Sequence, residues 1–104
     1  MIIYIDIDET ICMSPRNRDY SEAVPVTERI CKINKLYDEG NIIVYWTARG
    51  SGSGIDWSEV TKEQLIKWKA KHHDLKLGKP VYDLFICDKA VNSIDFFKEK
   101  NGTS

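Results

Sequence analysis

Short apolar runs alternate along this chain with segments whose apolar residues recur at helical spacing. The runs expected to be strands are 2–7 (IIYIDI), 42–46 (IIVYW), 74–77 (DLKL, the weakest) and 82–86 (YDLFI). The segments expected to be helices are 25–39, followed by Gly40, a stretch from Ser58 or Thr61 to about His72, and 91–100. Strands that alternate with helices are typical of α/β folds, so we predict a mostly parallel sheet with right-handed crossovers. The stretches 11–25 and 47–57 are expected to be loops.

Length and composition indicate one ordinary globular domain over residues 1–104. The chain is 42% hydrophobic and 30% charged, and its net charge of -1 gives no reason to expect a nucleic acid or an anionic membrane as partner. Its three cysteines lack metal-ligand spacing and suit reduced thiols better than a disulfide scaffold. We see no signal peptide and no stretch that approaches the ~20 apolar residues of a membrane helix, and therefore expect a cytoplasmic protein.

Two carboxylates close the first predicted strand. Asp6 and Asp8 are separated by one residue, so they share a face of a straight strand and disfavour each other's ionisation. Polar residues also follow the other predicted strands: Thr47, Lys79 and Asp88. Because the carboxyl ends of parallel strands lie at one edge of a sheet, where α/β proteins bind ligands, we expect these side chains to converge there.

The expected cluster suits phosphate chemistry. A cation between the carboxylates would remove their repulsion, and a small set of oxygen ligands from Asp6, Asp8 and Asp88 suits Mg²⁺, which keeps several waters. The metal would neutralise and orient a phosphate, while Lys79 and the hydroxyl of Thr47 would stabilise its oxygens. One aspartate can attack phosphorus to form an aspartyl-phosphate, and the other can act as general acid and base.

The same residues resemble the signature of the haloacid dehalogenase-like (HAD) phosphatase superfamily. That pattern is DxDxT after the first strand, Thr or Ser after the second, Lys after the third and an acidic motif after the fourth. The corresponding segments here are D-I-D-E-T (6–10), W-T-A-R (46–49), G-K-P (78–80) and C-D-K-A-V-N (87–92). The resemblance spans nearly the whole chain. It implies a Rossmann-like three-layer sandwich with a mostly parallel central sheet of about four strands.

The resemblance also implies a role for each residue. Asp6 would be the nucleophile and Asp8 the general acid and base, with Thr47 and Lys79 stabilising the phosphate and the intermediate. Asp6, the main chain of Asp8, and Asp88 would bind Mg²⁺. The expected activity is that of a Mg²⁺-dependent phosphomonoesterase.

Two features depart from the family pattern. The fourth motif usually carries two acids, whereas here Cys87 precedes Asp88, and Asn92 stands where GDxxxD has its second acid; this change would weaken metal binding. The segments after Thr10 and Thr47 are too short for a cap domain, so the chain resembles capless members, which act on large substrates or assemble so that a neighbouring subunit covers the site. A homo-oligomer is therefore a reasonable expectation. A narrower resemblance, to small phosphatases found beside sugar and capsule biosynthesis genes, implies a small phosphorylated metabolite, with a sugar phosphate favoured, as substrate.

Several candidate residues also have an ordinary structural interpretation. Thr47 can cap a turn, Asp88 can cap the last helix, and Lys79 can be a surface lysine. His72 and His73 are more readily explained by favourable charge at a helix C-terminus than by metal binding.

Two other classes of function stay open. A phospho-accepting receiver domain also gathers acids, Thr and Lys around Mg²⁺, but its phosphorylated Asp follows a central strand, where this chain has Thr47. A catalytically weak binding module is suggested by Cys87. The roles of three arginines near the expected site, which can contact substrate or form ion pairs, also stay open: Arg16, Arg18 and Arg49.

Overall fold

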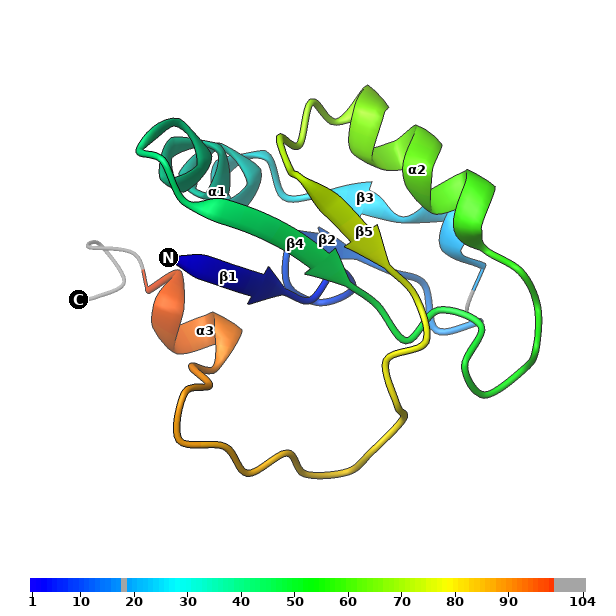
Figure 1. Cartoon of the computed structure of the whole chain (residues 1–104). Coiled ribbons are helices and arrows are strands. Elements are labelled where there is room, and N and C mark those ends of the chain that lie inside the picture. Colours follow the sequence, from blue (N-terminus) through cyan, green and yellow to red (C-terminus); the bar gives the residue numbers. More distant parts are fainter. Residues whose placement is uncertain (18, 99–104) are drawn as a thin grey trace.

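The structure, a computed structural model, describes residues 1–17 and 19–98, so Arg18 and the expected end of the last helix lie outside the described residues. Its elements are β1 (Ile2–Ile5), β2 (Cys12–Met13), η1 (Tyr20–Glu22), β3 (Val24–Pro25), α1 (Thr27–Asp38), β4 (Ile42–Trp46), α2 (Ser58–Lys67), β5 (Asp74–Lys76) and α3 (Ser93–Phe96) (Figure 1). None of the described helices has the length and apolar character needed to cross a membrane.

The main sheet has three parallel strands in the order β1-β4-β5. Ile2–Ile5 pairs with Ile42–Tyr45, and Val44–Trp46 pairs with Asp74–Lys76. The sequence predicts all three strands, and their arrangement confirms an α/β fold with a parallel sheet. Because the strands are parallel, the residues that follow them lie at one edge of the sheet.

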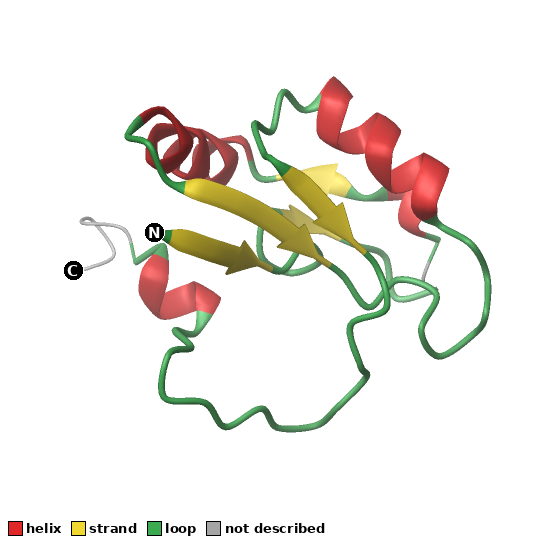
Figure 2. Cartoon of the chain, viewed as in Figure 1, coloured by secondary structure: helices red, strands yellow, loops and turns green. Residues whose placement is uncertain are grey.

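The predicted fourth strand is wrong. Residues 82–86 lie in a loop that runs from Leu77 to Asn92 (Figure 2). Their large apolar side chains are exposed. Only five residues separate the end of β5 at Lys76 from Tyr82, whereas a crossover between parallel strands needs a dozen or more. The composition of YDLFI suits a buried strand, but the preceding connection is too short to return it to the sheet.

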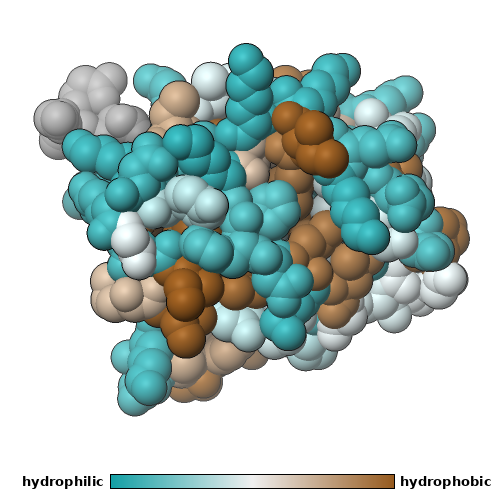
Figure 3. All heavy atoms as spheres, turned by 45° about the horizontal axis from the view of Figure 1, so that its top comes forward, coloured by the Kyte–Doolittle hydropathy of each residue, from teal (hydrophilic) through white to brown (hydrophobic). Residues whose placement is uncertain are grey.

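The helices α1 and α2 cover one face of the main sheet (Figure 1). Their buried side chains form one core cluster with alternate side chains of β1 and β4: Ile5, Ile30, Ile33, Ile43, Tyr45 and Leu65. On the opposite face, Ile2, Tyr4 and Ile42 are exposed, while Val44 of the central strand is buried. The described residues therefore form two layers rather than the predicted three. Hydrophilic side chains cover much of the surface in Figure 3, and hydrophobic atoms occur between them in separate patches.

Both long helices end in a Schellman motif, in which one residue takes a left-handed conformation. After α1 this residue is Gly40, with a φ of 99°, and Asn41 donates its N–H to a carbonyl five residues earlier. After α2 it is Lys69, with a φ of 58°. A glycine signals such an end in the sequence and a lysine does not. The prediction that this helix continues to about His72 is therefore wrong.

A short hairpin, which the sequence analysis does not predict, follows the turn after β1. Strands β2 and β3 pair antiparallel within a stretch expected to be a loop. The 14–23 loop between them is held against α2, because Gln64 donates to the carbonyl of Tyr20 at 2.6 Å and the Tyr20 ring packs edge-on against Trp57. This loop forms one side of the carboxyl end of the sheet.

The buried hydroxyl of Tyr45 has no hydrogen-bond partner among the described residues. A buried polar group without a partner destabilises a fold by ~1–3 kcal/mol, so we expect Tyr45→Phe to leave the free energy of unfolding unchanged or to raise it, as measured in urea titrations. The matched control is Thr61→Val, because the buried Thr61 hydroxyl donates to Trp57 and accepts from Arg49. This control should destabilise the protein by ~1–3 kcal/mol. A clear loss of stability in Tyr45→Phe would show that the hydroxyl has a partner.

Candidate functional site

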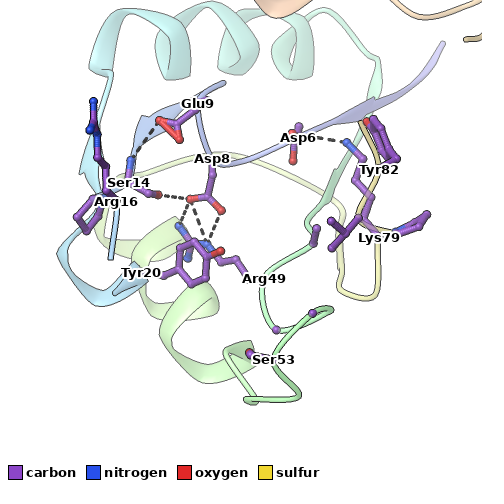
Figure 4. Close-up of a pocket in the computed structure, with 16 residues that line it drawn as sticks. Asp6, Asp8, Glu9, Ser14, Arg16, Tyr20, Arg49, Ser53, Lys79 and Tyr82 are labelled. Atoms are coloured by element: carbon purple, nitrogen blue, oxygen red, sulfur yellow. Dashed lines mark hydrogen bonds and ion pairs between the residues drawn. The ribbon is translucent and has the colours of Figure 1, made fainter. Parts of the chain in front are cut away.

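An open cleft of about 1000 Å³ lies at the carboxyl end of the main sheet (Figure 4). Four parts of the chain line it: the turn after β1, the 14–23 loop, the 47–57 loop and the start of the 77–92 loop. Three of the predicted site residues, Asp6, Asp8 and Lys79, are among the lining residues. The fold thus brings the first and third predicted motifs together.

The turn after β1 reverses the chain within the D-I-D-E-T motif. The carbonyl of Ile7 accepts the N–H groups of Thr10 and Ile11, at 3.1 and 2.9 Å. Glu9 takes the left-handed conformation, with a φ of 60°, and donates its N–H to the carbonyl of Cys12 at 2.8 Å. A non-glycine residue is uncommon in this conformation and needs such support. The turn therefore holds both aspartates at the end of the strand.

Asp6 and Lys79 form an ion pair in the cleft. The Nζ of Lys79 lies 3.5 Å from Oδ2 of Asp6, and Oδ1 accepts the N–H of Ile7 at 2.9 Å. Burial raises the pKa of Asp6 above its ordinary value of 3.8, and the nearby Asp8 carboxylate raises it further. The ammonium group and the Ile7 N–H act in the opposite direction. The Asp6 side chain is still 41% exposed, so a ligand in the cleft can reach it.

Lys79 is fixed by main-chain and ring contacts. Its N–H donates to the carbonyl of Thr47 at 3.1 Å, and its own carbonyl accepts the hydroxyl of Ser51 at 2.7 Å. Its ammonium group lies 5.9 Å from the ring centre of Trp46 and 5.5 Å from that of Tyr82, and such rings attract a cation. The loop after β5 therefore presents this amine to the cleft.

Asp8 is bound by a buried arginine. Nη2 of Arg49 donates to Oδ1 at 2.8 Å, Nε donates to Oδ2 at 3.0 Å, and the Ser14 hydroxyl also donates to Oδ1 (Figure 4). The Arg49 side chain is 0% exposed and the Asp8 side chain 20%. Burial alone would raise the pKa of Asp8, but the hydrogen bonds from Arg49 and Ser14 outweigh it, so this pKa is lowered. Asp8 is therefore ionised at neutral pH.

The remaining groups of Arg49 are also paired. Nη1 donates to the Thr61 hydroxyl at 3.1 Å and to Oε1 of Gln64 at 2.6 Å. The guanidinium lies over the Tyr20 ring, 4.8 Å from its centre. The sequence alone leaves the role of this arginine open. The available signal was on α2, where Thr61 and Gln64 are buried beside Leu65, because buried polar groups need a partner.

Two predicted site residues do not reach the cleft. Thr47 is buried and does not line it, and its hydroxyl accepts the N–H of Arg49 at 3.1 Å. Asp88 lies on the exposed 77–92 loop and accepts the thiol of Cys87 at 3.8 Å. Because residues 82–86 are not a strand of the sheet, the acid that follows them is not carried to the cleft.

Asn92 and the two histidines make structural contacts. Oδ1 of Asn92 accepts the N–H of Ile94 at 2.8 Å, so it is this residue that caps α3. Nδ1 of His73 accepts the N–H of Ile43 at 3.1 Å, and Nδ1 of His72 lies 2.8 Å from a main-chain carbonyl. His73, which directly precedes β5, therefore links the start of that strand to β4.

A buried thiol beside the carboxylate is not a candidate nucleophile. Sγ of Cys12 lies 3.5 Å from Oδ1 of Asp8, and burial raises the pKa of this thiol to about 12. The thiolate is the reactive form of cysteine, so Cys12 is unreactive at neutral pH. Carboxylate chemistry is better suited to this cleft.

The carboxylate oxygens of Asp6 and Asp8 are of the donor type that a divalent cation prefers. Mg²⁺ is often held by one or two carboxylates together with waters and a substrate phosphate. Burial raises the pKa of Asp6 and the Asp8 carboxylate raises it further, and a cation beside the two carboxylates would favour their ionised forms. Within residues 1–17 and 19–98, no three acidic, histidine or cysteine side chains are gathered into a metal-binding group. The donors present fit a Mg²⁺ ion that also takes ligands from water, from phosphate or from a further acid.

No family model and no curated protein matches this chain. Its fold is similar to that in the crystal structure of an MCSG target from Vibrio cholerae, with a TM-score of 0.81 and 23% sequence identity. The match covers 97% of this chain and 91% of the Vibrio chain. At this identity the likeness shows the fold alone, and it agrees with the α/β architecture described above.

Replacement of Arg49 tests whether its buried charge holds the site together. Arg49→Met leaves Asp8, Thr61 and Gln64 without their donor, and breaking a buried ion pair costs ~3–5 kcal/mol. We expect urea titrations at neutral pH to show a loss of unfolding free energy of about this size. Arg49→Lys should lose less, because it keeps the charge but not the forked hydrogen bonds.

The pH dependence of this loss follows from the lowered pKa of Asp8. A carboxyl group whose pKa is lower in the folded state adds stability above its unfolded value of 3.8, and this stability is lost as the pH falls through the folded value. Without the guanidinium the pKa of Asp8 is higher in Arg49→Met, so the advantage of the wild type should shrink as the pH falls from the folded-state pKa of Asp8 in the variant to its lower value in the wild type. An advantage that stays constant across this range would exclude the ion pair as its source.

Two glycines of the 47–57 loop test how closely the chain packs at the cleft. Gly50 has a φ of 83°, and a Cβ there would lie 2.1 Å from the carbonyl oxygen of Ile55. Gly54 has a φ of 78°, but a Cβ there would have nothing within 4 Å. We expect Gly54→Ala to cost ~1–2 kcal/mol, from backbone conformation alone, and Gly50→Ala to cost clearly more in thermal unfolding. Equal costs would contradict the close approach.

Proposed function

We propose that this chain is a Mg²⁺-dependent phosphomonoester hydrolase that works through an aspartyl-phosphate intermediate. The supporting observation is the Asp6–Lys79 ion pair in the cleft, next to the ionised Asp8. These three residues occupy the D-I-D-E-T and G-K-P motifs, which resemble those of HAD phosphatases. The function rests on this site, because a fold alone does not determine an activity.

Asp6 is the nucleophile in this proposal. Its carboxylate is the more exposed of the two and can attack the phosphorus of a monoester, so that the bond to the leaving oxygen breaks and an acyl phosphate forms. Lys79 lies 3.5 Å from the attacking carboxylate and would stabilise the phosphoryl oxygens as negative charge builds up on them.

Asp8 is the general base of the second step. A water attacks the acyl phosphate at phosphorus, Asp8 takes the proton, and inorganic phosphate and the Asp6 carboxylate are released. Because its pKa is lowered, Asp8 is ionised at neutral pH and can accept this proton, although the same shift makes it a weaker base. In the first step the ionised carboxylate has no proton to give to the leaving group, so esters with acidic leaving groups are the favoured test substrates.

Thr47 is a positioning residue in this proposal. Its carbonyl accepts the N–H of Lys79, and its hydroxyl accepts the N–H of Arg49. Thr47, which directly follows β4, thereby orients both Lys79 beside Asp6 and Arg49 beside Asp8.

Asp6 and the main chain of Asp8 would hold the Mg²⁺ ion, and we propose Asp88 as a third ligand. When bound, the ion supplies positive charge that neutralises and orients the phosphate. Asp88 does not line the cleft in this structure, so this role requires the 77–92 loop to take another position.

A small phosphorylated metabolite, with a sugar phosphate as the favoured class, is the proposed substrate. Besides the acids and Lys79, the cleft is lined by hydroxyl and guanidinium groups of Ser53, Tyr20 and Arg16, which suit a hydroxyl-rich, charged ligand.

Substitution of the nucleophile tests the proposal. We expect the purified protein to hydrolyse para-nitrophenyl phosphate only when Mg²⁺ is present, and Asp6→Asn to lower kcat by ~10³ or more. Asp38→Asn is the matched control, because Asp38 is a surface acid paired with Lys71 and should leave kcat unchanged. Lys79→Met should lower kcat by ~10²–10³.

Other results would point to the alternatives. Mg²⁺-dependent turnover that survives Asp6→Asn would exclude this residue as nucleophile. Stable phosphorylation of an aspartate by a small phosphodonor, without release of phosphate, would favour a receiver domain. Binding of phosphorylated metabolites without any turnover would favour a binding module.

A further inference from the structure

Part of the 77–92 loop forms an arm that leaves the body of the protein and returns to it. Its start is held by Lys79, whose N–H donates to the carbonyl of Thr47, and its end is held at α3, where Phe97 is buried in the core. Between these two anchors it follows a wide arc (Figure 1). We refer to residues 80–92 as the arm.

The arm carries large hydrophobic side chains that are exposed. They are Val81, Tyr82, Leu84, Phe85, Ile86 and Val91. Leu84 is 75% and Ile86 86% exposed, in a run of apolar residues with the composition of a strand. Contiguous apolar exposure of this kind marks an interaction surface.

Strand β1 has a free edge. Within the described part of the chain it pairs only with β4, and Met1, Ile2 and Tyr4 are exposed. An unpaired edge offers N–H and C=O groups to which another strand can be added. The chain therefore contains both halves of a strand pair, an apolar arm and an open edge, but does not join them.

The arm is too short to pair in parallel with β1 of its own chain. Lys79 is anchored at the carboxyl end of the sheet, and three Cα–Cα steps of ~3.8 Å carry Tyr82 at most ~11 Å from it. A parallel strand beside β1 would begin at the opposite end, ~13 Å away along a strand that rises ~3.3 Å per residue, and beyond the width of β1 itself. Such a return needs a connection of a dozen or more residues.

The direction of the arm fits a second copy of the chain. The arm starts where the strands end and runs back toward the side on which β1 begins, so it runs opposite to its own β1 (Figure 1). A two-fold axis at the edge of the sheet and perpendicular to the strands reverses the strands of a second copy. The same arm can therefore run parallel to β1 of that copy, and the contact is reciprocal.

We propose that two copies of this chain exchange their arms, so that residues 82–86 of one copy form a parallel strand beside β1 of the other. A second copy is the occupant because it offers an apolar strand and an open edge at the same time. Pro80 favours an extended start to the arm, since its ring fixes φ and disfavours a helical conformation at Lys79.

The exchange also completes the cleft, a consequence that rests on the proposed function. A parallel strand over residues 82–86 ends at the carboxyl edge of the sheet that it joins, so it carries Asp88 toward Asp6 of the other copy. Each cleft then combines Asp6, Asp8 and Lys79 of one chain with Asp88 of the other.

The mass in solution tests the exchange without an assay of activity. We expect light scattering to give about twice the 12.0 kDa mass of one chain, and Leu84→Lys to return it to that of a single chain. Ile66→Lys is the matched control and should remain a dimer, because Ile66 is also 75% exposed but lies on α2, outside the arm. Ile86→Lys repeats the test if Leu84→Lys does not accumulate. A monomeric wild type, or a dimer that arm variants leave intact, would overturn the exchange.

Co-expression of two inactive chains tests which copy supplies Asp88 to each cleft. In an exchanged dimer of one Asp6→Asn chain and one Asp88→Asn chain, one cleft carries both substitutions and the other carries neither. Random pairing makes half of the dimers mixed, so we expect about one quarter of wild-type turnover from the mixture. If each chain keeps its own arm, every cleft of a mixed dimer carries one substitution, and the mixture stays inactive.

The two measurements distinguish failure of the exchange from failure of the proposed function. A dimer that depends on Leu84 but lacks Mg²⁺-dependent turnover would support the exchange and overturn the function. Mg²⁺-dependent turnover by a protein that is a monomer in solution would support the function and overturn the exchange. A dimer that depends on Leu84 and is active, but whose mixed chains stay inactive or whose Asp88→Asn form keeps full activity, would overturn the delivery of Asp88.

Discussion

The site depends on a single buried charge, the guanidinium of Arg49. An arginine cannot lose its proton inside a protein, so its burial is tolerated only where its donors find partners. The partners here come from distant parts of the chain: Asp8 from the turn after β1, Thr61 and Gln64 from α2, and the Tyr20 ring from the 14–23 loop. One side chain therefore fixes one wall of the cleft, and its requirement for partners explains why α2 buries polar side chains.

Local sequence patterns predicted most of the fold, because apolar runs mark its strands and a glycine marks the end of one helix. Three apolar runs became the three strands of the sheet, and Gly40 marked the end of α1. The errors arise where the deciding contact is distant or the signal is absent. Residues 82–86 have the composition of a buried strand, but the connection before them is too short to return them to the sheet, so they lie in a loop. Lys69 ends α2 in a conformation that its residue type does not announce.

The difference between local signals and distant contacts also explains which parts of the candidate site could be predicted. Asp6, Asp8 and Lys79 were predicted to meet because they follow parallel strands, and they do line one cleft. Arg49 donates to Asp8 at 2.8 Å, but most of its other partners lie in α2 and in a loop that spacing along the chain does not relate to it. The prediction that Asp88 lies at the cleft depended on residues 82–86 forming a strand of the sheet. These residues lie in a loop, so Asp88 does not reach the cleft.

Lys79 belongs to two parts of the molecule at once. Its main chain is bonded to the carbonyl of Thr47 just before the arm departs, while its ammonium group is the cation beside Asp6. Tyr82, at the start of the arm's apolar run, places its ring over the same ammonium group. A change in the position of the arm would therefore move the Lys79 ammonium group, which lowers the pKa of Asp6. The path of the arm and the acidity of that carboxyl group are linked through one residue.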